Sequence, residues 1–240
     1  MPIPASIPMN SLNKALRDLA HGRPVLIYDA DGREEETDIV FASGFVKPAD
    51  VRFMRQHGGG LLCVTILANH ARMLGLPFLV EVYKAASPDF PVLKKSLPDR
   101  LPYDEKSAFS LAFNHRKCYT GITDLDRALT ISEFGKLAGK VESFSAKKAS
   151  EAFSSSFRIP GHVFLLRTSD EILKTRFGHT ELATAMCLMA GLPASAAICE
   201  MMGEDDKALS ERLARRFAQP KKLQYLEGYE VVEAWKKWCE

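Results

Sequence analysis

The chain has 240 residues, of which 32 are basic and 30 are acidic, and its formal net charge is +2. So small a charge argues against a protein that binds nucleic acid through the phosphate backbone. Hydrophobic residues make up 46% of the chain, enough for the core of one large domain. We therefore expect a single domain over residues 1–240.

The cysteines and the first residues indicate the compartment. Five cysteines, an odd number without a Cys-x-x-Cys pair, argue against a disulfide framework or a structural zinc site. Residues 1–12 lack the basic and apolar regions of a secretory signal, and no apolar run approaches the roughly 20 residues that span a bilayer. We expect a cytoplasmic protein that does not bind a membrane.

In the first half of the chain, short apolar runs between turn residues predict strands, and capped apolar periodicity predicts helices. The predicted helices cover 11–20, 48–56 and 68–74, and the predicted strands cover 24–28, 39–45 and 61–66. Residues 84–105 are rich in proline and mixed charge, so we expect an irregular region there.

In the second half, strands are predicted over 108–113, 158–166 and 196–200. We expect one helix capped by Asp124 or Asp126, a second from about Ser132, and a third over 180–190 that Gly191 stops. The charged and apolar residues of 204–240 predict a C-terminal extension packed on the outside. This irregular order of strands and helices predicts an α+β fold or an α/β sandwich.

The segment 29–38, Asp-Ala-Asp-Gly-Arg-Glu-Glu-Glu-Thr-Asp, is the most informative feature of the chain. Six of its ten residues are acidic, and apolar runs enclose it, so it predicts a loop between two strands at the rim of a sheet. These carboxylates repel one another, and a cation such as a metal ion would balance them. A solvated hairpin tip is the alternative.

The segment 176–181, Arg-Phe-Gly-His-Thr-Glu, lies at the start of the helix predicted over 180–190. Helix starts carry unpaired N–H groups and partial positive charge, and Arg176 adds a donor suited to phosphate. His179 could ligate a metal ion. Alternatively, Thr180 only caps the helix and His179 only packs beside it.

Three further residues are candidates of a weaker kind. His162 follows a Pro-Gly turn and could act as an acid or base, or merely bond a carbonyl. Glu200 ends an apolar run; it is a solvated terminus unless it faces a cavity, where its pKa would rise. Cys63 lies in an apolar run and is expected to be a small core residue.

Taken together, a loop of carboxylates and a helix start with arginine, histidine and threonine indicate one site. Oxygen ligands with one imidazole suit Mg²⁺ or Mn²⁺. A pocket for anions beside the metal suits a phosphorylated small molecule.

These segments resemble the 3,4-dihydroxy-2-butanone 4-phosphate synthase family of riboflavin biosynthesis. Its motifs occur in order at 29–38, 120–123 with 126–128, 161–164, 176–181 and 198–200. The segment Asn114-His115-Arg116-Lys117 resembles the archaeal, monofunctional branch.

The resemblance implies a three-layer α/β/α sandwich with a mixed sheet. It implies a lyase that converts D-ribulose 5-phosphate through a metal-stabilised enediol to L-3,4-dihydroxybutan-2-one 4-phosphate and formate. It also implies Mg²⁺ or Mn²⁺ as cofactor, and a homodimer with sites near the subunit interface.

Residue roles follow from the resemblance by position. Glu34 and His179 would hold the metal, with Glu36 near it, and Cys63 and Thr120 would line the pocket. The catalytic residues would be His162, Glu200 and Asp38. The substrate would be bound by Arg33, Glu34, Asp38, Thr120, Arg176, Phe177, Gly178, His179, Thr180 and Glu200.

The acidic loop departs from the family pattern at two positions. Thr37 replaces a glycine and Glu35 replaces a small polar residue. We expect Thr37 to stiffen the loop, because glycine allows more backbone conformations.

Two other functions remain open at this stage. Related α/β sandwich folds include nucleotide- and RNA-binding proteins, and fold does not fix function. Another sugar-phosphate isomerase or aldolase could use the same enediol chemistry.

Overall fold

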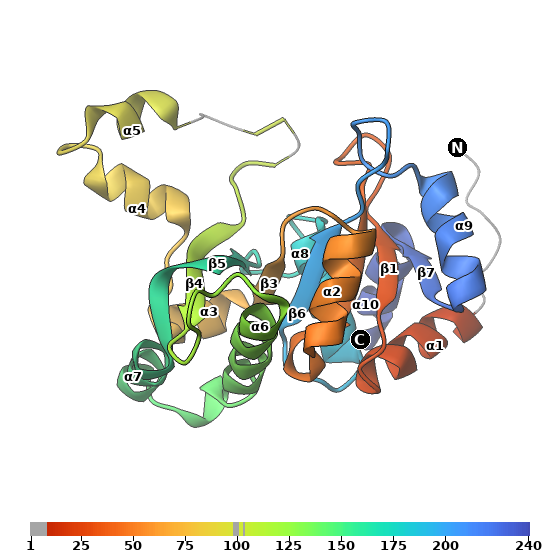
Figure 1. The fold of residues 1–240 in the computed structure, drawn as a ribbon, viewed down its shortest axis with the longest axis horizontal. Coiled ribbons are helices and arrows are strands. Elements are labelled where there is room, and N and C mark those ends of the chain that lie inside the picture. Colours follow the sequence, from red (N-terminus) through yellow and green to blue (C-terminus); the bar gives the residue numbers. More distant parts are fainter. Residues whose placement is uncertain (1–8, 98–100, 103) are drawn as a thin grey trace.

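The computed structural model describes residues 9–97, 101–102 and 104–240 and arranges their strands in a seven-stranded mixed sheet (Figure 1). The strand order is β4-β5-β3-β6-β2-β1-β7, with β3–β5 and β1–β7 parallel and the other pairs antiparallel. The strands are β1 (Val25–Tyr28), β2 (Thr37–Ala42), β3 (Cys63–Ile66), β4 (Phe109–His115), β5 (Phe157–Arg167), β6 (Ala196–Glu200) and β7 (Gln224–Glu227).

Helices cover both faces of this sheet (Figure 1). One face packs against α2 (Pro48–His57), α3 (Ala68–Leu74), α6 (Asp124–Ala138), α7 (Ala146–Ser156) and α9 (Glu211–Lys221). The other packs against α1 (Met9–Ala20), α8 (His179–Met189) and α10 (Gly228–Trp238). The predicted α+β fold, a three-layer α/β/α sandwich with a mixed sheet, is confirmed. None of the helices in the described ranges is both long and apolar enough to cross a membrane.

The central strands read as continuous apolar runs because both of their faces are buried. In β1, Val25 and Ile27 join the core under α8, whereas Leu26 joins the core on the opposite face. All six residues of β2 are buried, including the polar Thr37 and Asp38. Polar residues this deep in a sheet need a partner or a function.

The proline-rich region is more regular than the sequence predicts. It contains α4 (Leu79–Ala86) and α5 (Pro91–Ser96), which stand beyond the β4 edge of the sheet (Figure 1). Pro91 occupies the first turn of α5, where its missing N–H costs no hydrogen bond. The prediction of an irregular region is therefore wrong for these two helices, while residues 98–100 and 103 lie outside the described residues.

The helix after the Thr-Gly turn is continuous, so the predicted break near Ser132 is wrong. Its cap is also one residue earlier than predicted, because Thr123 accepts the N–H of Asp126. Asp124 and Asp126 lie in the first turn instead, where they face the positive end of the helix dipole.

Two further boundaries differ from the sequence predictions. β2 ends at Ala42, and Ser43–Phe45 form a 3₁₀ turn, η1. The segment 204–240 is not only an outer layer, because its strand β7 pairs with β1 in parallel register and forms an edge of the sheet. A second 3₁₀ turn, η2 (Val141–Ser143), precedes α7.

Candidate active site

Two carboxylates lie opposite each other where β2 begins and β6 ends. Asp38 pairs in register with Glu200. Side chains alternate along a strand, so Asp38 and Glu200 point to the same face as Val40 and Ile198, which pack under α8. The first residue of α8 is His179. The sheet and the helix thus bring together two sequence segments that are about 140–160 residues apart.

The acidic loop is folded by its own first carboxylate. Asp29 is buried and accepts the backbone N–H groups of Glu34 and Glu36, each at 3.0 Å. Its Oδ2 also lies 3.1 Å from the guanidinium of Arg33. Burial opposes the charge of Asp29, but the His179 ring and the backbone N–H groups lower its pKa. The segment is therefore a structured loop and not a solvated hairpin tip.

Thr37 lies in the strand that follows the loop and not in the loop itself. It is the first residue of β2, paired with Tyr28, and its carbonyl accepts the N–H of Met201 at 2.8 Å. The loop residues in the left-handed region are Gly32 and Glu35, with φ of 76° and 57°. The left-handed conformation that favours glycine is thus needed at residues before position 37 and not at position 37 itself, so a threonine fits at position 37.

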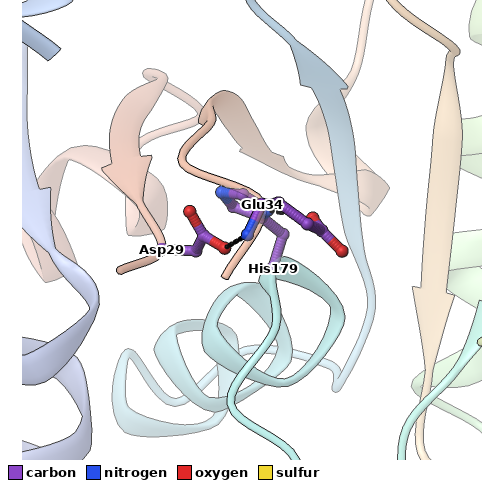
Figure 2. A group of neighbouring side chains, drawn as sticks. All are labelled: Asp29, Glu34 and His179. Carbon is purple, nitrogen blue, oxygen red and sulfur yellow. Dashed lines mark hydrogen bonds and ion pairs between the residues drawn. The ribbon is translucent and has the colours of Figure 1, made fainter. Parts of the chain in front are cut away.

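His179 lies at the centre of the acidic cluster (Figure 2). Its Nδ1 lies 3.3 Å from Glu34 Oε2, and its Nε2 lies 3.8 Å from Asp38 Oδ1. Burial alone would lower the pKa of His179, but the carboxylates of Asp38, Glu34 and Asp29 outweigh it and raise that pKa to about 10. The cluster therefore attracts positive charge strongly.

One carboxylate oxygen in this cluster lacks a hydrogen bond among the described residues. This oxygen is Asp38 Oδ1, which is buried. Burial raises the pKa of Asp38 well above its ordinary value, and the nearby Glu200 adds to the rise. Asp29, Glu34 and His179 bring one ligand atom each within 4.8 Å of one another. This donor set, carboxylates with one imidazole, fits a divalent cation.

Glu200 is held by the glycine-rich turn that precedes β3. The N–H of Leu61 donates to its Oε2 at 2.8 Å. A Cβ on Gly60 would lie 2.2 Å from that same oxygen, so only glycine leaves room for the carboxylate. Burial raises the pKa of Glu200, as expected of an acid or base that faces a cavity.

These residues line a cavity of about 350 Å³. The predicted site residues in its lining are Arg33, Glu34, Glu36, Asp38, Cys63, Arg176, Gly178, His179, Thr180 and Glu200. Cys63 is a buried core residue whose pKa burial raises, so it is an unreactive thiol in the wall.

The two arginines of the cavity are oriented by carboxylates that the sequence did not single out. Arg33 pairs with Asp104 at 2.7 Å, and its guanidinium lies on the backbone of Gly178, where a Cβ would lie 2.4 Å away. Arg176 pairs with the fully buried Glu181 at 2.8 Å. Asp104 lies in an irregular segment without a local pattern. Glu181 is the last residue of the 176–181 segment, whose sequence does not show that it pairs with Arg176.

Three predicted site residues do not line this cavity. Phe177 is 43% exposed, and Thr120 and His162 are exposed. His162 lies near Thr120, since both contact Asn114, in a second cluster formed by β4, β5 and the turn before α6.

Known proteins with the same combination of segments identify the family. Residues 13–234 match the family described as 3,4-dihydroxy-2-butanone 4-phosphate synthase. The chain belongs to this family. A synthase of that name from Methanothermobacter thermautotrophicus is 44% identical, over 93% of this chain and 95% of that protein. One from Archaeoglobus fulgidus is 43% identical, over 95% and 94%.

Solved structures of synthases share the fold. A two-domain synthase from A. baumannii has a TM-score of 0.70 and 26% identity, over 90% of this chain and 55% of that chain. Another synthase, in complex with two magnesium ions, has a TM-score of 0.72 and 23% identity, over 94% and 96%. The fold of this chain is thus the fold of the synthase family.

The close approach of Gly60 to Glu200 yields a test. We expect Gly60→Ala to displace the carboxylate and lower kcat by about 10²-fold, the lower range of a positioned acid or base. Gly44→Ala is the matched control, because its Cβ would meet the nearest atom only at 4.0 Å. Steady-state kinetics and thermal melting of both variants check this expectation. Full activity in Gly60→Ala would contradict the assigned position of Glu200.

Proposed function

We propose that this synthase converts D-ribulose 5-phosphate to L-3,4-dihydroxybutan-2-one 4-phosphate and formate for riboflavin biosynthesis. The observation that carries the proposal is the convergence of the acidic loop, Asp38, Glu200 and the start of α8 on one cavity. A nucleotide- or RNA-binding function is not favoured, because the family is one of synthases and the charge that lines the cavity is mostly acidic.

We assign the metal to Glu34 and His179, and the carboxylate of Asp29 lies close to both of them. The orphaned oxygen of Asp38 and the positive charge that the cluster attracts support a divalent cation, Mg²⁺ or Mn²⁺. The magnesium complex of a related synthase supports the choice of Mg²⁺. When bound, the ion supplies Lewis acidity to the carbonyl and hydroxyl oxygens of the sugar.

The phosphate of the substrate fits the start of α8. Backbone N–H groups at a helix N-terminus bind anions, and Gly178, Thr180 and Arg176 line the cavity there. Glu181 fixes the Arg176 guanidinium through Nε, and the carbonyl of Arg167 accepts from its Nη2. Arg33, from the acidic loop, lines the same cavity with its guanidinium against Gly178, so it would add a second cation for the phosphate.

Asp38 and Glu200 suit the proton transfers. The substrate must lose a proton next to its carbonyl to give an enediol, then lose water, rearrange and release C4 as formate. Because burial raises the pKa of both carboxyls, each can hold a proton closer to neutral pH than an exposed carboxyl. They can accept a proton at one carbon and return it at another.

We infer that the active unit is a homodimer in which the partner brings His162 and Thr120 to this cavity. Both residues are exposed and outside the cavity of their own chain. Exposed apolar side chains lie near them in the sequence. Arg158, the residue before Ile159, donates a hydrogen bond to the Tyr119 carbonyl and so joins β5 to the turn that contains Thr120. These apolar residues are Tyr119, Ile122, Leu125 and Ile159.

An apolar groove of about 540 Å³ continues this surface between α4 and the strands β4 and β5. Its lining includes Leu79, Leu111 and Phe164 together with Ile159. Contiguous apolar surface of this kind marks a protein interface. A second copy of the chain is the occupant that would also complete the site.

The decisive experiment uses ribulose 5-phosphate labelled with ¹³C at C4. We expect labelled formate and the four-carbon phosphate in equal amounts by NMR. A sugar-phosphate isomerase or aldolase would consume the substrate without labelled formate, and a nucleotide-binding protein would not consume it. Either result would refute the proposed reaction.

The metal assignment is tested within the loop itself. We expect Glu34→Gln to abolish formate release, since it removes a charged ligand, whereas Glu35→Gln keeps it, because Glu35 is exposed and only accepts the N–H of Gly32. EDTA should inactivate the wild type, and Mg²⁺ should restore it. Activity that resists EDTA, or equal rates in the two variants, would sink the assignment.

The shared site is tested by mixing two inactive chains. His162→Ala and Glu200→Ala are each expected to be inactive as homodimers. In a random equal mixture, about half of the dimers contain one chain of each variant. Such a mixed dimer carries both substitutions in one site and none in the other, so about a quarter of wild-type activity should return. If each chain held a complete site, the mixture would stay inactive.

A further inference from the structure

We propose that Asn114 is a positioning residue that fixes His162 in the tautomer with its proton on Nε2. The proposal deepens the proposed function, since it rests on the catalytic role of His162. Asn114 opens the Asn-His-Arg-Lys segment, and neither the proposed metal site nor the proposed phosphate site includes it.

Asn114 is built into the fold beneath His162. It is 2% exposed and lies on β4, where the pairing with β5 shifts register between Phe113 and Asn114. At this bulge Gly161 approaches β4 so closely that a Cβ on it would lie 2.0 Å from the carbonyl carbon of Phe113. The bulge therefore brings the Asn114 amide next to the backbone and the ring of His162.

Two neighbouring groups fix which way the amide points. Asn114 Oδ1 accepts the backbone N–H of His162 at 2.9 Å, a donor that cannot be satisfied by an amide nitrogen. Asn114 Nδ2 faces the Thr120 carbonyl at 3.4 Å. Gly121, with φ of 98°, leaves room for the Asn114 amide, since a Cβ on Gly121 would lie 2.0 Å from Asn114 Nδ2.

With that orientation, Asn114 Nδ2 faces His162 Nδ1 at 3.1 Å. Nδ2 is a donor, so Nδ1 must be the acceptor and carry a lone pair. The proton of the neutral ring is therefore on Nε2, because the hydrogen bond of one ring nitrogen sets the state of the other.

This tautomer decides what His162 can do. Its Nε2–H donates a hydrogen bond to an oxygen of the sugar, where negative charge develops during the reaction. A base at Nε2 would require the opposite tautomer, which loses the bond from Asn114. Proton removal is thereby left to the carboxyls of Asp38 and Glu200.

The test reads the tautomer directly by long-range ¹⁵N–¹H NMR of histidine-labelled protein, with His162 assigned from the spectrum of His162→Gln. We expect wild-type Nε2 to be protonated and Nδ1 not. Asn114→Asp presents an acceptor and should place a proton on Nδ1. Protonated Nδ1 in the neutral wild-type ring, or an unchanged ring in Asn114→Asp, would overturn the proposal.

Kinetics separate positioning from simple damage. We expect Asn114→Asp to lower kcat by about 10²-fold at unchanged KM. Its melting temperature should also fall, because the new buried carboxylate faces the Thr120 carbonyl. Asn69→Asp on the surface of α3 should have no effect. Full kcat with a changed tautomer would refute the positioning role. A wild type with the expected tautomer that releases no formate would refute the proposed reaction and leave the tautomer assignment intact.

Discussion

The structure of this site depends on the charge balance around a buried imidazole. His179 is buried at the start of α8, within reach of carboxylates from the loop and from β2. Like charges at this density are unfavourable unless a cation lies among them. Without a metal ion the protonated ring supplies that charge; a divalent ion bound to His179 would displace a ring proton and supply the charge in its place. The excess of carboxylates is thus a requirement of the site and not a solubility device.

The fold supplies this arrangement through backbone contacts more than through side-chain packing. The β2–β6 pair sets Asp38 opposite Glu200, and Gly60 leaves the room in which the Glu200 carboxylate lies. Gly178 lets the Arg33 guanidinium lie on the helix start in the same way. Because glycine has no Cβ, these contacts place charged groups within hydrogen-bond range without displacing the core. Asp38, Glu200 and the start of α8 are therefore held in place by the backbone.

Local sequence patterns predicted the α+β class, the acidic loop and the start of α8, because these features rest on apolar periodicity and capping chemistry, whereas the three-layer arrangement came from the family resemblance. They failed where a long-range contact decides the outcome. β7 joins the sheet through its pairing with β1, and Thr37 fits because β2 already begins there. Asp104 has no motif, and the motif that contains Glu181 does not show its pairing with Arg176, since only the fold brings these carboxylates to the arginines.

Direct measurement of Mn²⁺ binding tests the central claim, that the acidic loop and His179 form a cation site. Electron paramagnetic resonance of free Mn²⁺ reports binding without any substrate or turnover. The account predicts that wild-type protein removes the free-ion signal, that His179→Gln does not, and that the exposed-loop variant Glu35→Gln behaves as the wild type does. Equal binding by His179→Gln and wild type would contradict it.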